Sequence, residues 1–201
     1  MITVIDYGVG NLASVQNMLK KCGVESQVTS DPEKIRQADK VILPGVGAFD
    51  AAMQKIIDRS LDEAIQETSK RGTLILGICL GAQLLLEASE EGTLNGLSMI
   101  KGTCKKIDVQ QIAPLRVPHM GWSEVNFVVG SPIAKFEEQP RFYFTHSYYM
   151  NCANPTEKLA TCFYGHEFTC GVIHENVMGL QFHPEKSHKF GSRLFTNFAA
   201  M

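Results

Sequence analysis

The chain has 201 residues, of which 44% are hydrophobic and 20% are charged, and its formal net charge is −2. These values are ordinary for a globular protein, and we expect residues 1–201 to form a single domain. The small negative charge gives no electrostatic basis for binding nucleic acid or an anionic membrane. No apolar segment approaches the roughly 18 residues that a membrane-spanning helix needs. No basic leader precedes the first apolar stretch, so we expect no signal peptide and a cytoplasmic location.

The cysteines also argue against several classes of protein. None of them forms a C-x-x-C pair or the spacing of a zinc site, so the sequence predicts no metal centre. In a chain of this length we expect reduced thiols rather than a disulfide framework. The six cysteines are Cys22, Cys79, Cys104, Cys152, Cys162 and Cys170.

The first half of the chain alternates between short apolar segments and segments with helical spacing. Such alternation predicts a parallel sheet covered on both faces, with a site beyond the carboxyl ends of the strands. Strands are predicted at residues 2–6, 24–28, 41–43 and 73–76. Helices are predicted around residues 12–19, from the Ser-Asp-Pro-Glu start at 30–33, and over 51–70 with a break near Ser60.

The second half is richer in strands and turns. Glycines and Asn95 between residues 92 and 102 indicate loops. A closing helix is predicted at 190–198, because Phe190, Leu194, Phe195 and Phe198 share one face. Strands are predicted at 142–144, 147–150, 159–163 and 177–182.

A candidate nucleophile lies in the segment Thr-Leu-Ile-Leu-Gly-Ile-Cys-Leu-Gly-Ala-Gln, which begins at Thr73. An apolar strand runs through Gly-x-Cys-x-Gly into a helix, and this pattern places Cys79 on the tight turn called a nucleophile elbow. Unpaired N–H groups in the first turn of the helix favour a thiolate and a developing oxyanion there. A buried core cysteine fits the motif alone nearly as well.

A candidate base follows in the segment Gln-Phe-His-Pro-Glu-Lys-Ser, which begins at Gln181. On an extended segment, residues two positions apart point to the same side, so we expect His183 and Glu185 to lie side by side. A carboxylate beside an imidazole fixes its tautomer and stabilises the imidazolium. The competing base is His146, which has no acidic residue within two positions. We therefore predict a triad of Cys79, His183 and Glu185.

These two motifs resemble those of the class I, triad-type glutamine amidotransferases. Four further motifs are similar to one branch of that family, the glutaminase subunits of imidazole glycerol phosphate synthases. They are Ile-Asp-Tyr-Gly-Val-Gly-Asn-Leu-Ala-Ser-Val at 5–15, Leu-Pro-Gly-Val-Gly-Ala-Phe at 43–49, Pro-His-Met-Gly-Trp at 118–122 and His-Ser-Tyr-Tyr at 146–149. The resemblance implies an α/β fold whose mixed sheet is parallel at its centre and flanked by helices. It also implies hydrolysis of glutamine to glutamate and ammonia, with no metal or organic cofactor.

The resemblance extends to the oxyanion hole. The N–H of Leu80 directly follows the nucleophile and is a natural donor to an oxyanion. The family match gives the second donor to Val46 or Gly47, in a Pro-Gly-Val-Gly loop that by itself reads as a strand-ending turn. The two glycines of this loop permit a peptide flip, so this half of the hole is predicted to be switchable.

Four residues are expected in the substrate pocket. Gln83 lies four residues after Cys79 on the expected helix, so it can stand near the nucleophile. The family match places Glu91 at the amino group of glutamine, although a solvated acidic surface is the default for this segment. Ser147 and Tyr148 carry over as pocket contacts, with strand packing as the alternative.

The resemblance also implies a partner. A chain of this length leaves no room for a second catalytic domain, so we expect the ammonia to be used by a separate cyclase subunit in a heterodimer. Lys186 follows Glu185, and Trp122 is expected in a Gly-Trp turn, so both are candidates for the partner interface. Core packing for Trp122 and a solvated surface charge for Lys186 are the alternatives.

Three other functions remain open from the sequence. The first is a paralogous glutaminase that supplies a cyclase-like partner in the amidination of surface sugars. The second is a hydrolase of another substrate, because cysteine elbows also occur in peptidases. The third is a non-catalytic binding module with the same fold, which the intact cysteine, histidine and glutamate disfavour.

Overall fold

The computed structural model describes residues 1–201 and contains an eleven-stranded mixed sheet and a two-stranded sheet. Five neighbouring strands at one side of the large sheet all run parallel, and their carboxyl ends therefore meet at one edge. This confirms the predicted mixed sheet, but these parallel strands lie at one side of the sheet, whereas we expected them at its centre. In spatial order the five strands are β2 (Ser26–Thr29), β1 (Ile2–Ile5), β3 (Lys40–Gly45), β4 (Leu74–Cys79) and β13 (Val177–Leu180).

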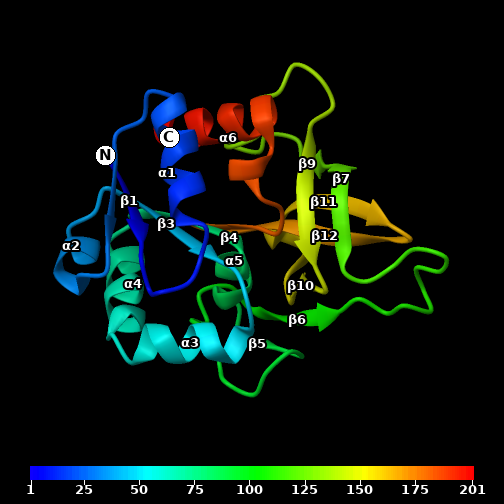
Figure 1. The fold of residues 1–201 in the computed structure, drawn as a ribbon, viewed down its shortest axis with the longest axis horizontal. Coiled ribbons are helices and arrows are strands. Elements are labelled where there is room, and N and C mark those ends of the chain that lie inside the picture. Colours follow the sequence, from blue (N-terminus) through cyan, green and yellow to red (C-terminus); the bar gives the residue numbers. More distant parts are fainter.

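The rest of the large sheet is mostly antiparallel and continues beyond β13 (Figure 1). Its order is β12 (His166–His174), β10 (Tyr148–Cys152), β6 (Gly102–Lys106) and β5 (Ala88–Ser89), with β11 (Lys158–Tyr164) and β8 (Asn126–Phe127) branching from β12. A separate antiparallel pair is formed by β7 (His119–Glu124) and β9 (Arg141–His146).

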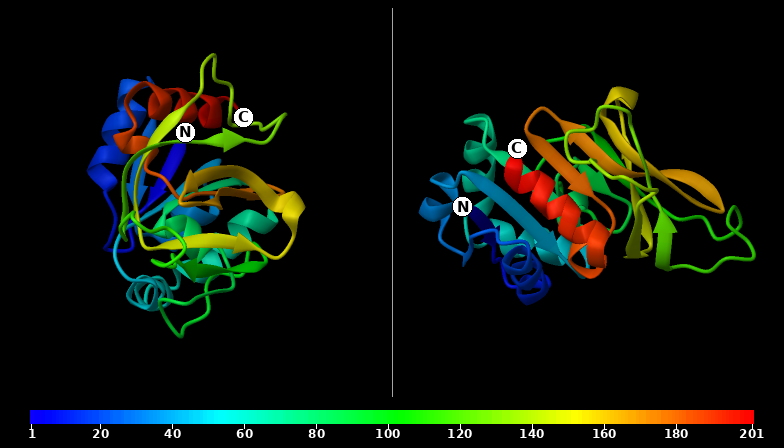
Figure 2. Two further views of the ribbon diagram at one scale, coloured as in Figure 1. Left: turned by 90° about the vertical axis from the view of Figure 1, so that its right-hand side faces the viewer. Right: turned by 90° about the horizontal axis from the view of Figure 1, so that it is seen from above.

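Helices cover both faces of the parallel strands, as Figures 1 and 2 show. On one face lie α1 (Leu12–Lys21) and α6 (His188–Ala200), and on the other α3 (Phe49–Ile57), α4 (Leu61–Lys70) and α5 (Leu80–Leu84). Two apolar clusters result, because alternate side chains of a strand point to opposite faces: Ile75 of β4 joins one cluster and Leu76 the other. None of the helices is long and apolar enough to span a membrane.

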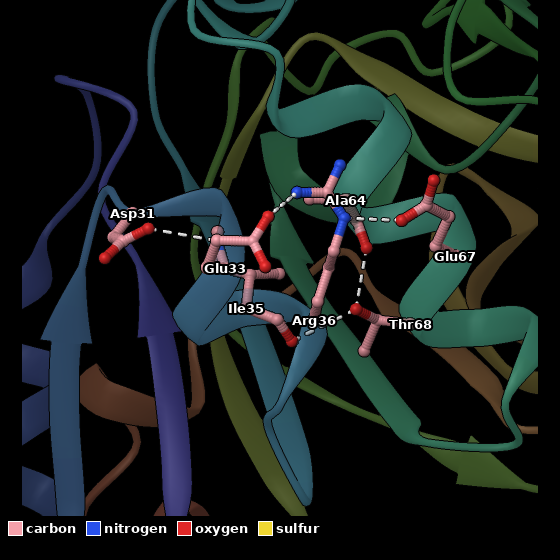
Figure 3. A network of polar contacts seen from close by, with 7 residues as sticks. All are labelled: Asp31, Glu33, Ile35, Arg36, Ala64, Glu67 and Thr68. Atoms are coloured by element: carbon pink, nitrogen blue, oxygen red, sulfur yellow. Dashed lines mark hydrogen bonds and ion pairs between the residues drawn. The ribbon is translucent and has the colours of Figure 1, made fainter.

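A short helix, α2 (Pro32–Arg36), is attached to α4 by a polar network (Figure 3). The Arg36 guanidinium donates to Glu33 at 2.7 Å and also to Glu67 of α4. The buried Thr68 hydroxyl lies 2.6 Å from the Ala64 carbonyl of its own helix and 3.0 Å from the Ile35 carbonyl of α2, so its one proton is shared between two acceptors. Because the carboxylates of Glu33 and Glu67 are exposed, the ion pairs contribute little to the attachment of α2.

Most predicted elements of the first half are confirmed, including the break near Ser60, which adopts a left-handed φ of 54° between α3 and α4. The prediction of a Gly-Trp turn at Trp122 is wrong. Trp122 lies within β7 and pairs in register with Tyr143 of β9. Its strand was missed because Pro118 and Gly121 suggest a turn, whereas pairing with a partner strand extends the backbone. The strands β6 and β12 were also not predicted.

Candidate active site

Cys79 lies at the junction of β4 and α5, at the carboxyl edge of the parallel strands. Its φ of 54° and ψ of −111° form a conformation that L-residues rarely adopt, and such strain is worth about 1–3 kcal/mol. Glycine is required at Gly81 next to it, because a Cβ there would lie 1.9 Å from the Leu43 carbonyl oxygen. Gly81 thus lets α5 pack closely on β3, and Gly77 lets it pack closely on β4, while the strained turn holds the thiol at the sheet edge.

His183 and Glu185 form a buried pair beyond the end of β13. His183 Nδ1 and Glu185 Oε1 are 2.7 Å apart, and the side chains are 1% and 2% exposed. We predicted their contact, but the extended segment that we expected is wrong. The chain turns through a 3₁₀ segment, η2 (Pro184–Lys186), and the Ser187 hydroxyl closes this turn by donating to the His183 carbonyl at 2.6 Å.

The environment of His183 favours its charged form. Burial would lower the pKa of His183, but its interactions with Cys79 and Glu185 outweigh burial and raise the pKa to about 10. Nδ1 faces the carboxylate, so Nε2, which is buried without a hydrogen-bond partner, is the nitrogen left for the thiol. Catalytic hydrogen bonds are often poorly aligned before substrate binds. The site therefore suits a thiolate beside an imidazolium, which is the form a cysteine nucleophile needs.

Cys79 and His183 line one pocket of about 330 Å³. That volume lies in the range of small-molecule sites. The pocket brings together all the predicted oxyanion and substrate residues, although Glu185 lies behind His183 and does not line it. The lining residues predicted from the sequence are Val46, Gly47, Cys79, Leu80, Gln83, Glu91, Ser147, Tyr148 and His183.

The predicted oxyanion donors flank the thiol. Gly45 of β3 pairs in register with Cys79 of β4, so Val46 and Gly47 follow directly beside the nucleophile. Gly47 has a φ of 106°, which favours glycine, and Val46 is 40% exposed. Leu80 is the first residue of α5, and its N–H has no partner within the helix. The Val46–Gly47 segment and Leu80 thus both line the pocket close to Cys79.

The remaining pocket residues are held by specific contacts. Gln83 is 5% exposed and donates through Nε2 to the Tyr148 carbonyl at 3.0 Å. Glu91 accepts from the backbone N–H of Phe49 at 3.0 Å, at the first residue of α3. The Glu91 carboxylate is thus anchored at a helix N-terminus while it lines the pocket, an arrangement that stabilises its negative charge.

Trp122 and Lys186 do not line the pocket, but they lie together beside it. The Lys186 ammonium is 5.7 Å from the ring centroid of Tyr143, and the Trp122 ring meets the same tyrosine edge-on at 6.3 Å. Trp122 is 44% exposed and stacks on His188. The two residues therefore form, with Tyr143, a partly exposed aromatic and cationic surface next to η2.

His146, the competing base, also lines the pocket, but both of its ring nitrogens are occupied. Nδ1 contacts the Tyr148 carbonyl at 2.8 Å, and Nε2 contacts Nδ1 of His119 at 3.0 Å. Burial and the neighbouring His119 lower the pKa of His146 to about 3. A neutral imidazole with no free nitrogen is a poor base for a thiol.

Four residues of the site were not predicted as site residues: Pro118 and Thr145 line the pocket, and His119 and Gln181 contact residues that line it. The ring of His119 stacks on Phe144 and Tyr164, and its motif at 118–122 gives no local signal of these contacts. Gln181 donates through Nε2 to Cys79 Sγ at 3.8 Å and is fully buried. Its position two residues before His183 on the same segment is the only signal that could have found it.

The comparisons identify the class of protein. The family model "Glutamine amidotransferase class-I" matches residues 3–201, and the chain belongs to this family. Solved structures agree on the fold. One described as "glutamine amidotransferase" superposes with a TM-score of 0.75 at 17% identity and covers 100% of both chains. PurLQS from Thermotoga maritima gives 0.73 at 22% identity, covering 99% of this chain and 97% of that one.

Curated relatives are much closer in sequence. The chain is 47% identical to "Imidazole glycerol phosphate synthase subunit HisH 2" of Pseudomonas aeruginosa, over 100% of both chains. It is 46% identical to the subunit HisH of the same synthase from Sulfurimonas denitrificans, over 98% of this chain and 97% of the relative. The Bacillus subtilis subunit HisH is 44% identical over 100% of this chain and 96% of the relative. The resemblance of the sequence motifs to this family is thereby confirmed.

Proposed function

We propose that the protein is the glutaminase subunit of an imidazole glycerol phosphate synthase and supplies ammonia for histidine biosynthesis. Relatives that share 41–47% identity with the chain over nearly the full length are named as the subunit HisH of imidazole glycerol phosphate synthase. The single observation that best supports glutaminase chemistry is the pocket shared by Cys79 and His183, with Glu185 paired behind the imidazole. Residues 1–201 act as one catalytic domain, and the protein works in the cytoplasm.

The reaction begins at the sulfur of Cys79. The thiolate attacks the side-chain amide carbon of glutamine, and the carbonyl oxygen becomes an oxyanion that accepts from the N–H of Leu80 and from that of Val46 or Gly47. The imidazolium of His183 gives its Nε2 proton to the amide nitrogen. The carbon–nitrogen bond then breaks, and ammonia leaves a thioester on the cysteine.

Water completes the cycle. His183, now neutral, takes a proton from water while the oxygen attacks the thioester carbon through a second oxyanion. Collapse of this intermediate breaks the carbon–sulfur bond, releases glutamate and regenerates the thiolate beside the imidazolium. Glu185 keeps the imidazole in one tautomer and balances its charge in both half-reactions.

Substrate recognition is assigned to the polar groups of the pocket that are not already used in hydrogen bonds within the protein. Both N–H groups of the Gln83 amide are used inside the protein, so only its Oε1 is available, and this oxygen recognises a donor of the substrate. Glu91 pairs with the α-ammonium group of glutamine, because it offers a carboxylate at the pocket wall. Ser147 and Tyr148 contact the rest of the amino acid.

The acceptor of ammonia is a cyclase subunit, which docks on the face that carries the pocket mouth. Trp122 and Lys186 form part of that interface, together with the exposed Val46. The Pro44–Gly47 segment holds the second oxyanion donor, and the glycines in it allow two peptide orientations. Docking of the cyclase selects the productive orientation, so the isolated subunit is nearly idle.

The test is glutamate formation by the purified protein, with and without the cyclase subunit of the same organism. We expect a large activation by that cyclase and complete loss in Cys79→Ala. An electrophilic glutamine analogue should label Cys79, whereas Cys22→Ala, a change at another thiol, should leave labelling and turnover intact. Turnover that survives in Cys79→Ala would disprove the nucleophile. If only a cyclase-like paralogue activated the protein, it would belong to another pathway.

A further inference from the structure

Two glutamine side chains link the substrate pocket to the sulfur of Cys79. Gln83 Nε2 donates to the Tyr148 carbonyl and to Gln181 Oε1, each at 3.0 Å. Gln181 Nε2 in turn donates to Cys79 Sγ at 3.8 Å. The four groups form a continuous chain of hydrogen bonds that connects β10, α5, the end of β13 and the nucleophile.

The direction of this chain is determined by its first member. The Tyr148 carbonyl can only accept, so the Gln83 amide must turn its NH₂ group toward it. The second N–H of that group then donates to the oxygen of Gln181. A flip of Gln83 would place its oxygen against two acceptor oxygens, and a flip of Gln181 would place its NH₂ group against the NH₂ group of Gln83. The NH₂ group of Gln181 is thereby forced to point at Cys79.

Burial makes this donor effective. Gln181 is 0% exposed and Gln83 is 5% exposed, so water does not compete for their hydrogen bonds. The sulfur also lies 3.9 Å from the carbonyl oxygen of Thr145, to which the thiol can donate. A carbonyl oxygen favours the thiol, because it accepts from S–H and repels a thiolate. The N–H of Gln181 favours the thiolate, because hydrogen bonds to charged groups are stronger.

We propose that Gln181 is a positioning residue that, oriented by Gln83, donates to the thiolate of Cys79 and keeps it charged and aimed into the pocket. Gln181 and His183 approach the sulfur from one segment, and the backbone N–H of Gln181 is anchored to the Cys170 carbonyl at 2.9 Å. Gln181 supplies no proton to the reaction. Its contribution is made before the attack and again when the thiolate leaves the thioester.

This inference rests on the proposed cysteine chemistry, and its test is a rate of modification that needs no glutaminase activity. The rate at which iodoacetamide alkylates Cys79 is measured from pH 5 to pH 10 by mass spectrometry of the Cys79 peptide. Gln181→Met removes the donor, and Gln181→Asn keeps an amide that is one methylene too short. In both variants the midpoint pH of alkylation should rise by about one unit. With the cyclase subunit present, kcat should fall about tenfold, with KM changed less than about twofold.

Gln139→Met is the matched control. The Gln139 Nε2 also bridges two oxygen acceptors, the Val125 carbonyl at 3.0 Å and Asn126 Oδ1 at 3.1 Å, but it is exposed and outside the pocket. Its alkylation midpoint and kcat should match those of the unaltered protein. Gln83→Met should shift the midpoint in the same direction as Gln181→Met but by less, because Gln181 keeps its N–H and loses only its orientation.

Thermal melting identifies which of the variants fold, and either folded Gln181 variant decides the question. An unchanged alkylation midpoint in a folded Gln181 variant would overturn the proposal, since a merely structural glutamine does not alter the ionisation of the thiol. Failure of the glutaminase assignment is distinguishable from this outcome. It would appear as turnover that persists in Cys79→Ala, whatever the alkylation profiles show.

Discussion

The protein contains two buried histidine centres with opposite electrostatics. His183 is 1% exposed and faces the carboxylate of Glu185 and the thiol of Cys79, and these partners overcome burial to raise its pKa to about 10. His146 is 6% exposed and faces a carbonyl and a second imidazole, and burial lowers its pKa to about 3. Similar burial thus gives one charged and one neutral imidazole, because the charge of the partners decides which form is stable.

The hydrogen bonds of the neutral centre, through His146 and His119, all run in one direction. His146 must donate through Nδ1 to the Tyr148 carbonyl, which can only accept, so its Nε2 accepts from His119 Nδ1. His119 Nε2 is then left to accept from the Ser123 hydroxyl at 2.9 Å. Burial also lowers the pKa of His119 to about 4. The comparison separates a centre whose partners stabilise a charged imidazole from one whose neutral imidazole contacts the Tyr148 carbonyl.

The largest expected effect is the loss of glutamine turnover when the histidine of each centre is replaced by alanine. With the cyclase present, His183→Ala should reduce glutamine turnover by about 10³-fold or more, because a proton moves through this imidazole in both half-reactions. His146→Ala should reduce turnover by about tenfold or less, through a displaced Tyr148 and a higher KM. Steady-state glutamate formation measures both variants, and circular dichroism verifies that they fold. A small loss of turnover in His183→Ala together with a severe loss in His146→Ala would make His146 the base.

The second prediction removes the partner that makes His183 different. Glu185→Gln can still accept a hydrogen bond from the ring but cannot balance its charge, so turnover should fall by about 10²-fold, less than in His183→Ala. The pKa of His183 should move down from about 10 toward its ordinary value. A titration of the imidazole proton signals by nuclear magnetic resonance measures this shift. A pKa that stays near 10 would mean that Glu185 does not sustain the charge.

The two centres also differ in how far they could be predicted. Cys79 and His183 lie in continuous motifs whose local signals, an apolar strand, two glycines and a following carboxylate, indicate both structure and chemistry. The parallel strands were predicted for the same reason, because each is a short apolar run bounded by turn residues. Every pocket residue expected from the motifs lines the cavity, while the catalytic roles themselves stay predictions.

The contacts of His119 with His146, and the hydrogen bonds that link Gln83, Gln181 and Cys79, could not be predicted from the sequence. His119 and His146 meet only because β7 pairs with β9, and no local pattern predicts which strands pair. Gln181 reaches Cys79 across 102 positions in the chain. Its type and spacing are those of an ordinary strand residue, and only the folded contacts reveal that both of its amide ends are used.

The third prediction concerns stability against pH. For His119 and His146, a folded-state pKa below the unfolded value means that unfolding takes up protons in acid. The stability they contribute is present above about pH 6.5 and is lost as the pH falls toward 4 and 3. For His183 the sign is opposite, so its contribution is present below about pH 6.5 and is lost as the pH rises through 10.

Chemical denaturation between pH 7.5 and pH 4.5 tests the acidic limb. The unfolding free energy should fall by about 1–3 kcal/mol more in the unaltered protein than in His119→Gln, which keeps a donor and an acceptor but does not titrate. The same pair compared between pH 7.5 and pH 9 serves as the control, since His119 is neutral in both states there. Parallel stability curves at acidic pH would show that His119 is not a proton-sensitive element.

The smallest expected effect lies at the surface beside the charged centre. Trp122 and Lys186 share the ring of Tyr143, and Lys186 is the residue after Glu185, so a partner bound there would close over the pocket without touching His183. Trp122→Ala removes a large, half-exposed aromatic side chain. Lys186→Ala removes an ammonium group that lies over the ring of Tyr143. Each change should weaken association with the cyclase subunit by about tenfold, with Trp122→Ala the larger, because aromatic residues dominate interface energies.

Titration calorimetry with the cyclase subunit measures the affinity, and the ratio of glutamate formed to cyclised product measures the coupling. Phe163→Ala is the control, because Phe163 is an exposed aromatic, 70% accessible, on β11 and outside the pocket lining. We expect its affinity to be unchanged. Lys186 contacts the triad only through its backbone N–H, which donates to the His183 carbonyl at 3.1 Å and is kept in the alanine variant. Both variants should therefore keep the unaltered alkylation profile of Cys79 when the partner is absent. Unchanged affinity and coupling in both variants, or an equal loss in Phe163→Ala, would move the docking surface away from η2 and leave the chemistry at His183 as proposed.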